Sequence, residues 1–182
     1  MIPAEDILAR LLCAPLTLDS VSAHEAGHAV MWRLVYPHRR GLYAIRGGMP
    51  AVVPADGRDL DLATATMQEA ARHTLVKLAG YAGELLAYGW QDRVSDLAAL
   101  IADDWMRHEL GQSHRISWEE DEGGDIPCVM VIVKAQPTQW TLEVAAVNLE
   151  RFLGGAVELL EQNRGKWLAE RKKAREFFKG KI

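Results

Sequence analysis

Apolar residues recur every three or four positions along most of this chain, which predicts a mainly helical protein. The pattern is clearest over residues 20–36, before Pro37, and over a longer stretch that reaches Tyr88, where Gly89 is the expected C-cap. It returns at about 95–110 and again at about 138–178, with a break near Gly165. We therefore expect long helices in these four regions.

Two segments carry a different pattern, which predicts a small β component. Residues 41–54 read as a hairpin in which Gly47 and Gly48 make the turn. Pro50 and Pro54 in the returning strand indicate that this strand lies at a sheet edge. The apolar run 126–133 predicts a further strand, and it follows an acidic loop at 118–125. The expected fold class is mainly α with a small β component.

Length and charge narrow the classes of protein that fit. The 182 residues are 49% hydrophobic and 25% charged, which predicts one globular domain over 1–182. A net charge of −4 without a basic run argues against nucleic acid as a partner. No apolar run reaches the roughly 18–20 residues of a membrane span. The chain has only two cysteines, and its first residues are acidic and do not resemble a signal peptide. Both features favour a cytoplasmic location.

The segment His24-Glu25-Ala26-Gly27-His28 carries the clearest chemistry. Histidines four residues apart on a helix lie on the same face, where both imidazoles can bind one Zn²⁺. Glu25 can then serve as the general base for a zinc-bound water. The alternative is that His24 and His28 are two ordinary helix histidines without a metal.

A zinc site needs a third protein ligand, and spacing alone does not select it. No further histidine follows His28 at the distance that an extended zinc motif requires. The candidates lie downstream and are Glu69, His73, Glu84, Asp92, Asp96, Asp103, Asp104 and His108.

Three segments follow the residue pattern of one known protein family. The first is His24-Glu25-Ala26-Gly27-His28-Ala29, spelled as in that family's zinc helix. The second is Ala79-Gly80-Tyr81-Ala82-Gly83-Glu84, followed by apolar residues and Gly89. The third is Ser95-Asp96-Leu97, similar to the family's helix that begins Asn-Asp-Leu. A fainter fourth match is Leu159-Leu160-Glu161-Gln162-Asn163-Arg164. Together these segments resemble the peptidase domain of the FtsH-type membrane AAA proteases. No phosphate-binding loop of an ATPase module accompanies them.

The resemblance implies an HExxH zinc-peptidase helical domain and roles for particular residues. Asp96, on the helix at about 95–110, would be the third zinc ligand, with Asp92 or Glu84 as alternatives. As a second-layer residue, Glu84 would orient His24 or His28. The predicted edge strand would bind substrate by strand addition. Its substrate-binding residues are Met49, Ala51, Val52 and Val53. Residues 118–137 have no counterpart in the family.

The sequence thus predicts a zinc-dependent endopeptidase that acts on unfolded or flexible protein substrates. Two alternatives stay open at this point. One is a non-catalytic interaction or regulatory protein derived from a peptidase. The other is a regulatory HExxH peptidase that cleaves a repressor, for which the third ligand would lie elsewhere. A separate ATPase partner and a homo-oligomer are both compatible with the sequence.

Overall fold

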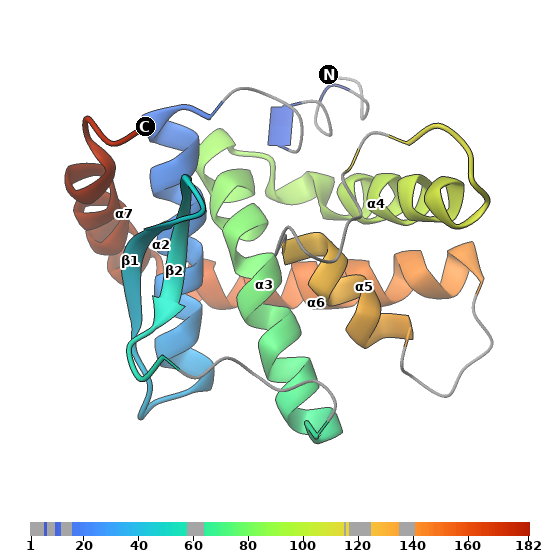
Figure 1. Cartoon of the computed structure of the whole chain (residues 1–182), viewed down its shortest axis with the longest axis horizontal. Coiled ribbons are helices and arrows are strands. Elements are labelled where there is room, and N and C mark those ends of the chain that lie inside the picture. Colours follow the sequence, from blue (N-terminus) through green and yellow to red (C-terminus); the bar gives the residue numbers. More distant parts are fainter. Residues whose placement is uncertain are drawn as a thin grey trace.

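A computed structural model gives the fold of the chain. It describes residues 6, 10–11, 16–57, 64–114, 116, 125–134 and 141–182, with residues 131–134 as backbone only. This part of the chain is mainly helical, as predicted, with six α-helices and one antiparallel hairpin (Figure 1). The elements are α2 (Leu18–Val35), β1 (Gly41–Arg46), β2 (Met49–Pro54), α3 (Met67–Tyr88), a 3₁₀ turn (Gln91–Arg93), α4 (Val94–Glu109), α5 (Asp125–Lys134), α6 (Leu142–Gln162) and α7 (Arg164–Phe178).

Helices α2 and α3 cross in backbone contact, and glycines make this possible. A Cβ on Gly27 of α2 would lie 1.9 Å from the carbonyl oxygen of Ala79. A Cβ on Gly83 of α3 would lie 2.3 Å from the carbonyl oxygen of Ala23. No side chain could occupy either position without separating the helices. The close approach brings side chains of α2 into contact with the backbone of α3.

The remaining helices build one main core around this crossing. Helix α7 packs on α2, while α6 packs on both α3 and α4. Figure 1 shows α6 running behind α3, and α7 and the hairpin beside α2. The largest fully buried side chains come from most of these elements and include Met31, Leu85, Leu97, Ile101, Leu153 and Trp167. In the described part of the chain, no helix is both long and apolar enough to cross a membrane.

The hairpin lies where the sequence predicts it, and its register follows from the turn. Gly47 and Gly48 have φ of 57° and 83°, so both central residues adopt the left-handed conformation of a type I′ turn. Arg46 opposes Met49, and Tyr43 opposes Val52. The two-residue turn makes Arg46 and Met49 a hydrogen-bonded pair, after which bonded and non-bonded pairs alternate.

This alternation determines which groups β2 presents at its open edge. Pro50, Val52 and Pro54 fall at non-bonded pairs with β1, so their backbone polar groups point outward. Neither proline has an N–H. The Pro54 carbonyl accepts from the Gly57 N–H at 3.0 Å. The open edge therefore offers the N–H and carbonyl of Val52 and the carbonyl of Pro50.

The predicted strand at 126–133 is wrong, because this segment lies in helix α5. An apolar run of this length fits a buried helix as well as a strand. Ile126, Val129 and Met130 are all buried in the main core. Their spacing of three and four residues is that of one helix face. Pro127 falls in the first turn, where the helix has no use for its missing N–H. The acidic residues 118–124 lie outside the described part of the chain.

A buried carboxylate joins the hairpin to α2 and α7. Glu170 of α7 accepts hydrogen bonds from Arg33 Nη1 at 2.7 Å, from Lys173 Nζ at 2.7 Å and from the Tyr43 hydroxyl at 3.0 Å. Burial alone would raise the pKa of Glu170. The hydrogen bonds from Lys173, Arg33 and Tyr43 outweigh burial and lower this pKa below its usual 4.5. An ionised Glu170 thus holds the hairpin against the helices.

We predict that Glu170→Gln destabilises the protein by about 1.5–3 kcal/mol at pH 7, because it weakens charge-assisted hydrogen bonds to a buried group. The pKa of Glu170 is lower in the folded state than in the unfolded state, so its contribution is complete above pH 4.5 and is lost as the pH falls further. Urea unfolding at pH 7 and pH 3 should therefore show a smaller difference between wild type and variant at pH 3. Glu176→Gln, on the exposed side of α7, is the matched control and should be near neutral. An equal difference at both pH values would contradict this account.

Candidate metal centre

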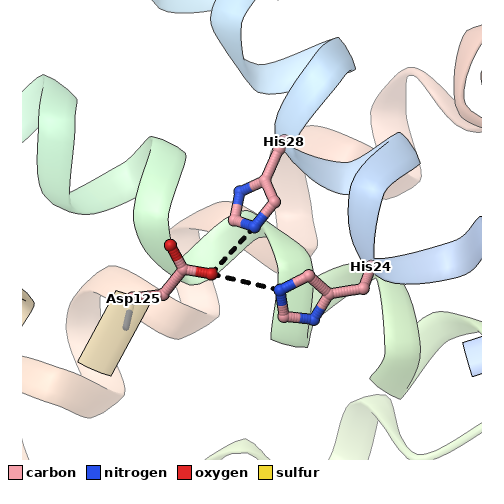
Figure 2. A group of neighbouring side chains, drawn as sticks. All are labelled: His24, His28 and Asp125. Atoms are coloured by element: carbon pink, nitrogen blue, oxygen red, sulfur yellow. Dashed lines mark hydrogen bonds and ion pairs between the residues drawn. The ribbon is translucent and has the colours of Figure 1, made fainter. Parts of the chain in front are cut away.

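Two histidines and one aspartate converge on a single point. His24 and His28 project from α2, and Asp125 is the first residue of α5 (Figure 2). Oxygen Oδ2 of Asp125 lies 3.1 Å from His24 Nε2 and 2.9 Å from His28 Nε2. Among the described residues, this is the one group of His, Cys, Asp or Glu side chains in which three potential metal-ligand atoms lie close together.

The opposite ring nitrogens determine what these atoms can do. His28 Nδ1 lies 2.7 Å from the carbonyl oxygen of Val76, which can only accept, so this nitrogen carries the proton. In the neutral ring, Nε2 of His28 is then a bare acceptor that faces a carboxylate oxygen. Two acceptors at 2.9 Å need a proton or a metal ion between them. The same holds for His24, whose Nδ1 lies 2.7 Å from Glu84 Oε1.

The donor set fits a zinc ion. Two imidazole nitrogens and one carboxylate oxygen are typical of catalytic zinc sites, which keep a fourth position open. Bonds of about 2.0–2.1 Å in a tetrahedron put neighbouring ligand atoms about 3.3 Å apart. The separations of 3.1 and 2.9 Å to Asp125 Oδ2 are close to this value. All three ligand atoms lie within 4.8 Å of one another, so together they could hold one ion.

Helix α3 supplies a second layer of contacts to all three residues. Glu84 holds His24, and the Val76 carbonyl holds His28. Lys77 Nζ lies 3.2 Å from Oδ1 of Asp125, the oxygen that does not face the histidines. Partners of this kind fix the ring orientation and the tautomer of metal-binding histidines.

A glycine on α3 makes room for the His24 ring. A Cβ at Gly80 would lie 2.4 Å from His24 Nε2 and 2.5 Å from its Cε1. The imidazole therefore lies flat against the α3 backbone. Glu84, one turn further along the same face of α3, can then reach the ring from the other side. Gly80 thus leaves space for the His24 ring, and Glu84 fixes the orientation of that ring.

The electrostatics of the site favour a cation where the three atoms meet. Burial alone would lower the pKa of His24, but its contacts with Asp125 and Glu84 outweigh burial and raise this pKa well above 6.5. Burial alone would raise the pKa of Asp125, but His28, Lys77 and His24 together lower it well below 3.8. A buried carboxylate that stays ionised beside two imidazoles is a ready ligand for a divalent ion.

Glu25, the predicted general base, lines the same cavity as His24 and His28. It is only 5% exposed, and its Oε2 has no hydrogen-bond partner among the described residues. Burial raises the pKa of Glu25, although His28 and His24 partly offset this effect. A carboxylate with a raised pKa binds a proton more readily near neutral pH, which suits a general base.

The site opens into a cavity of about 470 Å³ between the hairpin and the two crossing helices. His24, Glu25 and His28 lie on one wall, and Lys77 and Glu84 lie on another. The whole of β2 also lines this cavity, including the predicted substrate-binding residues Met49, Ala51, Val52 and Val53. Strand β2 therefore borders the same cavity as the convergent ligands.

The structure differs from the sequence expectation on the third ligand. Asp96 lies in the first turn of α4, where its side chain is 42% exposed and pairs with Arg93 Nε at 2.8 Å. The structure does not bring Asp96 to the histidines, and Asp92 is exposed on the 3₁₀ turn before α4. Asp125 takes the position expected of Asp96. Glu84, an alternative third ligand, contacts the far nitrogen of His24 and so lies in the second layer.

Comparisons with known proteins add no assignment. The chain matches no protein-family model, no curated protein and no solved structure. The interpretation of this centre therefore depends on its own geometry.

We predict that the wild-type protein binds one equivalent of Zn²⁺ and that Asp125→Ala weakens this binding at least about 100-fold, since two histidines alone make an incomplete site. Asp96→Ala is the control, because that side chain pairs with its neighbour Arg93 and does not belong to the group formed by His24, His28 and Asp125. Competition with a chromophoric chelator measures both affinities. Loss of zinc binding in Asp96→Ala, with binding retained in Asp125→Ala, would restore the sequence-based assignment.

Proposed function

We propose that this protein is a zinc-dependent endopeptidase that hydrolyses peptide bonds of unfolded or flexible protein segments. The observation that carries the proposal is the buried Glu25, whose Oε2 has no hydrogen-bond partner among the described residues, next to two convergent histidines in an open cavity. A helix residue that served packing alone would gain nothing from a buried carboxylate, whose desolvation costs free energy. The resemblance to FtsH-type peptidase domains supports the same class of enzyme.

His24, His28 and Asp125 would hold the metal ion in this proposal. When bound, Zn²⁺ would lower the pKa of a water molecule toward about 7 and polarise the scissile carbonyl. Glu25 accepts the proton of the attacking water and then donates it to the leaving amine. Its buried position keeps the proton from exchanging freely with solvent, and its raised pKa suits both directions of transfer.

The open edge of β2 is the proposed binding site for the substrate backbone. An extended peptide can pair with Val52 through two hydrogen bonds, because this residue presents both its N–H and its carbonyl outward. At Pro50 the peptide meets an acceptor but no donor. A folded substrate has no free backbone to offer, so this edge favours unfolded or flexible segments.

We predict that Glu25→Gln binds zinc like the wild type but cleaves unfolded casein at least about 100-fold more slowly, since general-base catalysis is lost. The amide keeps the size of the side chain, so a thermal melt should show no loss of stability. Glu176→Gln serves as the surface control.

Full activity in Glu25→Gln would contradict the mechanism. A zinc-loaded wild type that binds unfolded chains without cleaving them would instead favour the non-catalytic interaction protein.

We also predict that Pro50→Ala lowers the KM for unfolded substrates about 2- to 10-fold with little change in kcat. The substitution adds one N–H to the open edge, and a net hydrogen bond contributes about 0.5–1.5 kcal/mol. Initial rates over a range of concentrations of a labelled peptide separate the two constants. An unchanged KM in a stably folded Pro50→Ala variant would argue against strand addition at this edge.

A further inference from the structure

Lys77 contacts the candidate metal centre without being able to bind the metal as an ammonium group. It lies on α3, and its Nζ is 3.2 Å from Oδ1 of Asp125. The other carboxylate oxygen, Oδ2, faces both histidines (Figure 2). The two oxygens of Asp125 are therefore divided between a lysine on one side and the imidazoles on the other.

We propose that Lys77 is a positioning residue that holds Asp125 through Oδ1, so that Oδ2 alone serves as the metal ligand. The inference depends on the metal centre of the proposed function but not on peptide cleavage. The HExxH motif does not require a lysine at this position. The role of Lys77 follows instead from the way α3 and α5 are packed in this chain.

Asp125 needs such a partner because of where it lies. A carboxylate at the start of a helix readily accepts hydrogen bonds from the helix's own first N–H groups, which would turn it away from α2. A free carboxylate can also bind a metal through both oxygens. The ammonium group of Lys77 opposes both alternatives because it occupies Oδ1 from the α3 side.

The carboxylates around the centre also favour a cation at the position of Lys77. Three carboxylates with little exposure, Glu25, Glu84 and Asp125, surround the two histidines. A lysine beside Asp125 adds a positive charge to this group of carboxylates.

Repulsion between the ammonium group and the metal acts in the opposite direction. A lysine close to a divalent ion lowers metal affinity, and its removal would then tighten binding. The carboxylate of Asp125 lies between the two cations, which offsets this repulsion. Loss of a partner that orients a metal ligand typically weakens metal binding about 10- to 100-fold. We therefore expect the positioning effect to be the larger of the two.

The test compares Lys77→Met, Lys77→Arg and the exposed control Lys172→Met in the full chain. Chelator competition should show Zn²⁺ binding about 10- to 100-fold weaker in Lys77→Met. Lys77→Arg and Lys172→Met should bind zinc close to the wild-type affinity, because the first keeps the charge and the second leaves the site intact. A circular dichroism melt of each variant separates loss of the metal centre from loss of fold.

Cobalt substitution gives a readout that a structural role alone would not change. Four-coordinate Co²⁺ absorbs visible light more strongly than five-coordinate Co²⁺. Lys77→Met should therefore show a weaker visible band, because the second oxygen of Asp125 becomes available to the metal. Unchanged or tighter zinc binding with an unchanged cobalt spectrum in Lys77→Met would overturn the proposal. So would a Lys77→Arg variant as weak as Lys77→Met. A wild-type protein that binds zinc but cleaves no substrate would contradict the proposed peptidase activity without contradicting the role of Lys77.

Discussion

Two helices can meet backbone to backbone only where no side chain stands between them, and this constraint governs the crossing of α2 and α3. Gly27 and Gly83 lie where any Cβ would overlap a carbonyl of the other helix. Gly80 lies where a Cβ would overlap the ring of His24. Larger residues at these positions would separate the helices and move the imidazoles away from their partners. The close approach of the two helices is therefore a condition for the candidate metal centre as well as for packing.

The close crossing explains why one helix can orient ligands that belong to two others. Within about two turns of α3, the Val76 carbonyl contacts His28, Lys77 contacts Asp125, and Glu84 contacts His24. Each contact engages one polar atom of a ligand residue and leaves another, Nε2 of His24 or His28 or Oδ2 of Asp125, facing the other two ligands. The same crossing forms the floor of the cavity, and the hairpin, held by Glu170, forms its opposite wall. The proposed catalytic groups and the proposed substrate edge thus depend on the same packed framework.

The sequence predicted the local features of this molecule better than the distant ones. Histidines four residues apart defined one helix face, and two adjacent glycines defined the hairpin turn, because both signals lie within a few residues. Asp125 is 97 residues from His28 and ends a stretch that is mostly acidic, so no spacing distinguished it from its neighbours. The run after it was interpreted as a strand, which hid the helix that presents Asp125. The resemblance instead favoured Asp96, whose carboxylate pairs with Arg93. A search for acids that precede an apolar run with helical spacing could have included Asp125.

The central claim is that His24, His28 and Asp125 bind one divalent metal ion. The most direct measurement is a crystal structure of the zinc-loaded protein with anomalous diffraction data collected on both sides of the zinc absorption edge. Our account predicts a single strong zinc peak bounded by Nε2 of His24, Nε2 of His28 and Oδ2 of Asp125, with Lys77 on the other oxygen of that carboxylate. A peak coordinated by Asp96, or no peak at the histidines in protein that has been saturated with zinc, would contradict it.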